Sequence, residues 1–271
     1  MADIGISDEV IQSSWHASCD CEDDNNCFCV HSTCLINDDY LHAAWPPRPR
    51  LSHKGFFGHV WVFGGSQGYT GAPQLEGLGA YAAGAGLASI VCPDVVWSVI
   101  ASANLEVMAQ QESRASWKSV DAIVAGPGWG MGRDQLLSRL FECDSPMVVD
   151  ADALNLLAES NQSYDNWILT QHPGEAGRLL GKSSSEIQRD RFTSVNEISE
   201  QCGGITVLKG LGTLIQSKGG LPSVCPYGNP GMATGGMGDV LTGIITGLVA
   251  QGLSNLQAAE LGVVIHSKAG D

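Results

Sequence analysis

One segment of the chain combines an acidic residue with several glycines just before an apolar run. Residues 228–239 read Gly-Asn-Pro-Gly-Met-Ala-Thr-Gly-Gly-Met-Gly-Asp and lead directly into the apolar residues 240–249. The first N–H groups of a helix lack intrahelical partners and the helix dipole favours negative charge, so this junction can hold a phosphate. Asp239 beside such an anion hole could take a proton from a hydroxyl that attacks the bound phosphoryl group. The segment therefore indicates phosphoryl-transfer chemistry.

A plainer interpretation of this segment stays open. Thr234 or Asp239 could simply cap the helix, and the glycines could form a flexible loop. The spacing is not that of a P-loop, which needs Gly-Lys-Ser/Thr. It is not a dinucleotide fingerprint either, because no clear strand runs into Gly235. Other segments have to decide between these interpretations.

Further polar residues follow short apolar segments that we expect to be strands. Asp150 and Asp152 could hold Mg²⁺ or could form an Asx turn that caps the next helix; we favour the turn for Asp152 and leave Asp150 open. A lone histidine is often structural, but His172 lies between a strand end and Pro-Gly, which favours a site. Lys209 lies in an apolar strand, which indicates a phosphate partner rather than a surface charge.

The elements that must position these residues alternate in type. From His59 onward, short apolar strands alternate with longer helical segments, which predicts an α/β fold with a mostly parallel central sheet and helices on both faces. Glycine-rich residues 64–72 and 126–130 follow two of the strands, at the sheet edge where open α/β folds bind ligands. We expect helices from about Pro73 and Glu175. The expected strands are residues 60–63, 87–91, 122–125, 146–149 and 167–170, with two short strands around a glycine turn in 207–215.

Length and composition fit one large domain. The chain has 271 residues, of which 44% are hydrophobic, so it can bury a substantial core. A net charge of −15 argues against nucleic acid or an anionic membrane as the main partner. No stretch reaches the roughly 18 apolar residues of a spanning helix, and no signal peptide is evident, so we expect a cytoplasmic protein. The scattered cysteines are expected to act as small buried hydrophobes.

The first 44 residues differ in composition from the rest. They are acidic and carry five of the nine cysteines, with His16 and His31 among them. The spacing matches no standard zinc knuckle, so we expect a poorly ordered extension over residues 1–44, with a zinc site as the alternative. The proline-rich residues 45–50 mark the boundary, which leaves a domain at residues 45–271.

Taken together, these segments resemble the ADP-dependent NAD(P)H-hydrate dehydratase family of the ribokinase-like superfamily, in its bacterial form. The resemblance covers about Pro47 to Asp271. It rests on seven motifs in consistent order: His53-Lys54-Gly55, Gly64-Gly65-Ser66 through Gly71-Ala72, Gly126-Pro127-Gly128-Trp129-Gly130, Asp150-Ala151-Asp152-Ala153-Leu154, His172-Pro173-Gly174-Glu175, Lys209-Gly210-Leu211-Gly212-Thr213, and residues 231–239. Each motif alone is weak, and the ordered set makes the assignment.

The resemblance implies a repair reaction and a role for each motif. Members use a nucleotide, ADP in the bacterial type, to convert the hydroxyl of hydrated NADH or NADPH into a phosphate, which leaves and restores the cofactor. Asp239 would be the base, and the amides around Gly236 and Gly238 the anion hole. Ala72, Gly128, Gly130 and His172 would contact the hydrated dinucleotide, together with Asp239. ADP would be held by Lys209, Gly210, Leu211, Gly212 and Thr213, with Gly238. ADP is consumed as a co-substrate, and Mg²⁺ is the other expected cofactor.

The resemblance also implies partners, and the sequence shows departures. A homo-oligomer, a tetramer in the family, is expected, and an epimerase would be a separate partner; no residue is assigned to a resident metal site. Met237 stands where the family has Thr, Ala82 replaces an arginine, and the chain ends earlier than family members do. Two rivals remain: a ribokinase-like kinase for a hydroxymethyl compound or sugar, and an inactive nucleotide-binding regulator.

Overall fold

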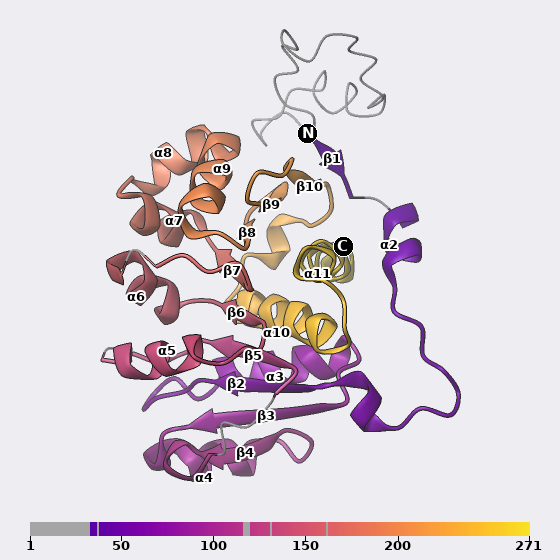
Figure 1. Ribbon diagram of the computed structural model, residues 1–271, viewed down its shortest axis with the longest axis vertical. Coiled ribbons are helices and arrows are strands. Elements are labelled where there is room, and N and C mark those ends of the chain that lie inside the picture. The colour runs from indigo at the N-terminus through magenta and orange to yellow at the C-terminus, as the bar shows by residue number, and fades with distance from the viewer. Residues whose placement is uncertain (1–32, 37, 116–119, 131, 161) are drawn as a thin grey trace, which may run out of the picture.

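The computed structural model describes residues 33–36, 38–115, 120–130, 132–160 and 162–271. These residues form a ten-stranded sheet flanked by helices (Figure 1). The sheet order is β1-β10-β9-β8-β7-β6-β5-β2-β3-β4, and β9 is antiparallel to both of its neighbours while the other pairs are parallel. The strands are β1 Cys34–Leu35, β2 His59–Phe63, β3 Leu87–Cys92, β4 Met108–Gln111, β5 Ala122–Ala125, β6 Met147–Val149, β7 Trp167–Gln171, β8 Ile205–Leu208, β9 Thr213–Ser217 and β10 Ser223–Cys225.

Helices cover both faces of the sheet (Figure 1). The helices α3, α10 and α11 lie on one face, and α5 to α9 lie on the other. Their bounds are α2 Asp38–Ala44, α3 Ala72–Ala82, α4 Asp94–Ala103, α5 Asp134–Phe141, α6 Asp152–Ser160, α7 Pro173–Leu180, α8 Ser184–Arg189, α9 Arg191–Cys202, α10 Met237–Ala250 and α11 Asn255–Gly270, with short 3-10 helices at Lys54–Phe57, Glu112–Arg114 and Pro230–Met232. The predicted mostly parallel α/β architecture is therefore confirmed.

Burial explains why the strands read as continuous apolar runs. The segments β5, β6 and β8 are buried at every position, as parallel strands covered on both faces must be. Two apolar clusters fill the spaces on the two sides of the sheet. Cys92, Cys202 and Cys225 are buried members of these clusters, as the sequence predicts for scattered cysteines.

Helices α3 and α10 approach each other at backbone distance. A side chain at Gly243 would place its Cβ 2.1 Å from the carbonyl oxygen of Glu76, and one at Gly247 would lie 2.7 Å from the carbonyl oxygen of Ala80. In the opposite direction, a Cβ at Gly79 would lie 2.6 Å from the carbonyl oxygen of Val240. The Ala- and Gly-rich composition of both helices is thus required for this contact.

Residues 33–44 differ from the expectation of a poorly ordered extension. β1 pairs with β10 in parallel, and Ile36 is buried in the core. α2 packs against α11, where the Tyr40 hydroxyl donates a hydrogen bond to the Glu260 carboxylate. The domain therefore begins before the proline-rich segment, because pairing on the edge strand extends the core. Residues 1–32, which hold most of the proposed zinc ligands, lie outside the described residues.

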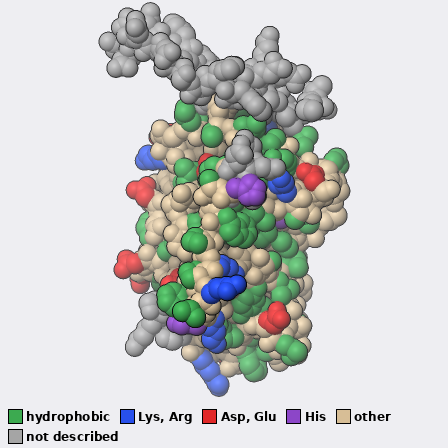
Figure 2. Space-filling model, turned by 90° about the vertical axis from the view of Figure 1, so that its right-hand side faces the viewer, with side chains coloured by type: hydrophobic (Ala, Val, Ile, Leu, Met, Phe, Trp, Pro, Cys, Tyr) green, Lys and Arg blue, Asp and Glu red, His purple; other side chains and the backbone are tan. Residues whose placement is uncertain are grey.

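On the face that carries α2 and α11, hydrophobic and uncharged side chains predominate, with basic side chains toward the lower end and scattered acidic ones (Figure 2). No helix in the described ranges is long and apolar enough to cross a membrane.

Candidate functional site

The glycine-rich loops after β2 and β5 meet where the strand order reverses. β2 leads to β3 on one side, whereas β5, on the other side of β2, leads to β6, so the chain leaves β2 and β5 in opposite directions. Open α/β sheets bind ligands in the crevice outside the carboxyl ends of such a pair. The N–H of Gly65 donates to the carbonyl of Pro127 at 2.8 Å, and the Trp129 indole N–H donates to the carbonyl of Phe63. The two loops therefore form one joined surface at the sheet edge.

The predicted substrate-contacting residues Ala72, Gly128 and Gly130 lie on this surface. Ala72 is the first residue of α3. Gly128 has a φ of 60° and leaves no room for a Cβ, which would lie 2.7 Å from the carbonyl oxygen of Tyr69. The N–H of Gly130 donates to Asp152 Oδ2 at 2.9 Å, so Asp152 ties this loop to the start of α6. This bond joins two loops and is not the Asx turn that the sequence favoured for Asp152.

Asp150 occupies a different position from Asp152, inside a network of bonds. Asp150 Oδ1 lies 3.0 Å from Lys209 Nζ, and its Oδ2 accepts a hydrogen bond from the Thr242 hydroxyl at 2.7 Å. Thr242 is on α10 and is fully buried, and its hydroxyl lies 3.2 Å from that of Thr170. Asp150 thus connects the ends of β6 and β8 to helix α10.

His172 and Glu175 form the start of α7. Nδ1 of His172 accepts hydrogen bonds from the N–H groups of Gly174 and Glu175, while the Glu175 carboxylate accepts from the N–H of His172. Burial, with the nearby charges of Lys209 and Arg178, lowers the pKa of His172, so the ring is neutral at pH 7 and its proton is on Nε2. His172 remains half exposed and can donate that hydrogen bond to a ligand.

Lys209 is the cation of the site. Besides Asp150, its Nζ lies 4.0 Å from Glu175 Oε2. Burial alone would lower its pKa, but the charges of Asp150 and Glu175 outweigh burial and raise it, so Lys209 stays charged. Burial raises the pKa of Glu175 to about 7, although the charge of Lys209 acts to lower it. A Cβ at Gly238 would lie 3.4 Å from Nζ, so the ammonium group stands beside the start of α10.

The glycine-rich loop and the first turn of α10 present unpaired N–H groups. Gly236 is the N-cap residue, with a φ of 92° that favours glycine. Among the described residues, the N–H groups of Gly236, Gly238 and Asp239 make no hydrogen bond. A Cβ at Gly235 would meet nothing within 4 Å, so the loop borders open space. This arrangement can bind an anion.

Asp239 lies in the first turn of α10 beside this loop. Its carboxylate makes no hydrogen bond to any residue that the structure describes. Burial, followed by the charge of Asp150, raises the pKa of Asp239 to about 6, with Lys209 opposing. An unbonded carboxylate with this pKa is ionised at neutral pH and is poised to accept a proton.

Arg191, which sequence reasoning missed, holds the loop after β8 in place. The buried guanidinium of Arg191 donates hydrogen bonds to the carbonyls of Leu208, Lys209 and Gly212. With these carbonyls engaged, the N–H groups of Gly210, Leu211 and Gly212 are left without partners within the described chain, and the Leu211 side chain is 56% exposed. The Thr213 hydroxyl closes the loop by donating to the carbonyl of Gly210.

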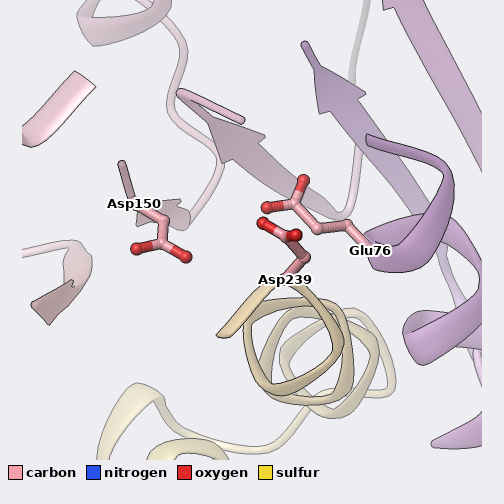
Figure 3. Close-up of side chains that lie close together, drawn as sticks. All are labelled: Glu76, Asp150 and Asp239. Atoms are coloured by element: carbon pink, nitrogen blue, oxygen red, sulfur yellow. The ribbon is translucent and has the colours of Figure 1, made fainter. Parts of the chain in front are cut away.

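The structure therefore brings together Asp239, Gly238 and Lys209, with Asp150 and Glu175 beside them. Gly210, Leu211, Gly212 and Thr213 extend from Lys209 along one loop, and no contact with Asp239 is recorded for them. Ala72 is connected to Asp239 through the packing of α3 on α10, and Gly128 and Gly130 lie on the neighbouring loop after β5. Sequence reasoning missed Glu76 as well, a fully buried residue of α3 whose carboxylate points at Asp239 (Figure 3). Its signal in the sequence is an isolated acid in an Ala/Gly-rich helix.

The sequence was compared with protein families and with known proteins. Residues 60–271 match the family described as NAD(P)H-hydrate dehydratase. The bifunctional NAD(P)H-hydrate repair enzyme of Coxiella burnetii is 48% identical over 83% of this chain and 48% of its own length, and the ADP-dependent (S)-NAD(P)H-hydrate dehydratase of Neisseria meningitidis is 40% identical over 83% of this chain and 80% of its own. The chain spans about half the length of the bifunctional relatives.

The fold comparison agrees. The crystal structure of the ADP/ATP-dependent NAD(P)H-hydrate dehydratase of Bacillus subtilis, co-crystallized with ATP/Mg²⁺, superposes with a TM-score of 0.79 and 30% identity, covering 87% of this chain and 88% of that one. A ribokinase-like superfamily protein shares the fold too, so the ribokinase-like expectation is confirmed. The resemblance seen in the seven motifs is confirmed as well: the chain belongs to the NAD(P)H-hydrate dehydratase family.

Proposed function

We propose that this chain catalyses the ADP-dependent dehydration of the S form of hydrated NADH or NADPH, restoring the cofactor and releasing AMP and phosphate. The observation that carries the proposal is Asp239: an ionised carboxylate without a hydrogen-bond partner in the described chain, in the first turn of α10, beside unpaired N–H groups and the Lys209 ammonium. A base next to an anion hole is what transfer of a phosphoryl group to a hydroxyl needs.

The reaction proceeds in two steps in this proposal. Asp239 takes the proton of the C6 hydroxyl as its oxygen attacks the β-phosphorus of ADP; the bond from that phosphorus to the bridging oxygen breaks, and AMP leaves. The C6–O bond then breaks with its electron pair leaving on phosphate, C5 loses its proton to solvent water, and the ring double bond reforms; Asp239 releases the hydroxyl proton to solvent before the next turnover. The N–H groups of Gly236, Gly238 and Asp239 stabilise the negative charge on the transferred group.

Two loops would hold the two substrates. The unpaired N–H groups of Gly210, Leu211 and Gly212 and the charge of Lys209 suit the phosphates of ADP, and exposed Leu211 suits its adenine. The hydrated dinucleotide would bind across from that loop, at the carboxyl ends of β2, β5 and β7. The groups that suit it there are Ala72, Gly128, Gly130 and the Nε2–H of His172. The ring then reaches the base from the side of α3.

Mg²⁺ belongs to this proposal as an ion carried by the nucleotide. Oxygens of Glu76, Asp150 and Asp239 lie within 4.8 Å of one another, which is close enough to share a cation. However, Asp150 already binds the Lys209 ammonium and the Thr242 hydroxyl, so a positive charge occupies the place that a resident ion would take. These carboxylates therefore do not fit a resident Mg²⁺, and nucleotide phosphates are the ligands that this ion commonly keeps.

The test is an assay with hydrated NADH and ADP, followed by the return of reduced nicotinamide absorbance, with ATP in parallel and the Asp239→Asn variant as control. Recovery with ADP supports the proposal. A persistent phosphorylated product without NADH would identify a kinase, and nucleotide binding without turnover would identify a regulator.

Three further parts of the proposal have their own tests. Light scattering measures whether the protein is a homo-oligomer. A separate epimerase is supported if the R hydrate reacts only when an epimerase is added, and cell fractionation tests the cytoplasmic location.

A further inference from the structure

Glu76 is the most completely buried acid near the proposed base. It lies on α3 with 0% of its surface exposed, and neither carboxylate oxygen has a hydrogen-bond partner among the described residues. A buried carboxylate without a partner is costly in the ionised form, because nothing replaces the water it has lost. The group must therefore be neutral or share a proton with a neighbour.

Backbone packing fixes Glu76 opposite Asp239. Gly243 lies one helical turn after Asp239, and its missing side chain lets the backbone of Glu76 touch α10 at that turn. The Glu76 side chain then extends along α10 toward the start of the helix, where its carboxyl group lies beside that of Asp239 (Figure 3). Oxygens of Glu76, Asp150 and Asp239 lie within 4.8 Å of one another. Asp150 is already bonded to Lys209 and Thr242, whereas no described residue bonds the Asp239 carboxylate, so Asp239 is the acceptor left for a proton on Glu76.

The charges around Glu76 keep it protonated. Burial raises its pKa well above the ordinary value, and the negative charges of Asp150 and Asp239 raise it further; only Lys209 acts in the opposite direction. Lys209 lies 3.0 Å from Asp150, so the positive charge near Glu76 is balanced by that carboxylate, and the charge of Asp239 remains. At neutral pH, Asp239 is ionised and Glu76 is neutral, which is how two adjacent carboxyl groups divide a single proton.

We propose that neutral Glu76 donates a hydrogen bond from its carboxyl O–H to the Asp239 carboxylate and so holds the base in the orientation that faces the anion-binding loop. Glu76 is a positioning residue in this account, because it acts through Asp239 and touches no reacting atom. The role rests on the proposed function of Asp239. No step consumes the proton on Glu76, so it returns unchanged after each turnover.

Two substitutions separate the donor from the charge. Glu76→Gln keeps a donor of the same shape, and we expect it to keep the rate within about threefold of wild type. Glu76→Met keeps the volume but removes the donor, and we expect kcat to fall about tenfold or more, the size of one hydrogen bond to a charged group. Glu159→Gln, the same change at an exposed position on α6, is the matched control.

The titration of Asp239 gives a measurement that needs no turnover. Carbon-13 labelled aspartate is followed by NMR against pH, with Asp239→Asn assigning the signal. Loss of a donor destabilises the ionised form, so in Glu76→Met the midpoint should move up from about 6, while in Glu76→Gln it should stay in place. Infrared spectroscopy with labelled glutamate at neutral pH should show a protonated glutamate band that is lost in both variants, beside the band of Glu175, whose pKa is about 7.

Three results would overturn the inference. A midpoint that moves down in both variants would mean that Glu76 is ionised in the wild type, because both remove a negative charge. Binding of Mn²⁺ without nucleotide, lost in Glu76→Gln, would make Glu76 a cation ligand. If the Asp239 midpoint does not move in a folded Glu76→Met protein, the hydrogen bond between Glu76 and Asp239 does not exist. None of these depends on the dehydratase assay, so failure of that assay alone would strike the proposed reaction and leave this contact testable.

Discussion

The two halves of the candidate site are built from different material. The loop at the start of α10 offers backbone N–H groups and owes its shape to glycines, with one titrating side chain, Asp239, in the first turn of the helix. The ends of β6, β7 and β8 offer side chains instead: Lys209 bonds Asp150 at 3.0 Å and lies 4.0 Å from Glu175. A backbone site depends on conformation and tolerates many side chains, whereas a charge network depends on each member because removing one leaves the others unpaired.

The division matches two tasks. A transferring phosphoryl group carries charge that develops during the reaction, and fixed N–H groups can meet it without moving. A nucleotide must be gripped in ground and transition state alike, which a point charge such as Lys209 can do. Substitutions in the two halves should therefore affect different kinetic constants.

The largest effect is expected at Asp239. Asp239→Asn removes the base and keeps the size of the side chain, so turnover should fall at least about 100-fold while the fold and nucleotide binding persist. Steady-state kinetics with a separate nucleotide-binding titration measure this. A variant that keeps a near wild-type rate would reduce Asp239 to a helix cap.

Protonation of Asp239 in acid should lower the rate of the reaction. The base must be ionised, and burial with the charge of Asp150 raises the pKa of Asp239 to about 6, so the rate should be halved near pH 6 and fall about tenfold per pH unit below it. A kcat/KM profile between pH 4 and 8, checked by circular dichroism for folding, measures the limb. A limb near pH 4 would place the base elsewhere.

Lys209 should separate affinity from rate. Lys209→Ala should weaken nucleotide binding about tenfold or more and change the rate at saturating nucleotide much less, because the ammonium binds phosphates that do not react. The same variant leaves Asp150 and Glu175 without their cation, so its thermal stability is measured alongside. Unchanged nucleotide affinity in a folded Lys209→Ala protein would take Lys209 out of the site.

The smallest effect is expected at Met237, within the backbone-built half. Met237 is half-buried at the first position of α10, and the loop binds through N–H groups, so Met237→Thr should leave the rate within about threefold or raise it by adding a hydroxyl. Turnover of the two purified proteins, with melting curves as control, decides this. A large loss in a folded variant would mean that the loop has another shape.

Strand ends were predictable from sequence because they combine two local signals. Apolar runs such as 122–125 and 167–170 end in glycine, proline or a polar residue, and the parallel arrangement then places all these ends at one edge. That placement accounts for Lys209, whereas Asp239 lies at a helix start, and it was the family resemblance that joined these two residues in one site. The predicted roles of the site residues await the experiments above.

What sequence could not supply depends on contacts that are distant along the chain. An acid in an Ala/Gly-rich helix normally faces water, and only the backbone contact with Gly243 buries Glu76. Arg191 reads as a surface residue until the carbonyls of the 208–212 loop surround it. β1 has two residues, too few for any periodic pattern, and it exists because β10 offers an edge.

The glycine contacts between α3 and α10 also set how the protein can move. Carbonyl oxygens seated against glycine Cα atoms leave no side chains to slide past each other, so the two helices can shift only as one rigid body. Ala72 begins one helix and Asp239 lies in the first turn of the other, and hence the crevice wall and the base travel together. Any opening that admits the dinucleotide or releases AMP must then come from hinge motion in the loop opposite, at Gly210, where glycine can absorb the change in backbone angles.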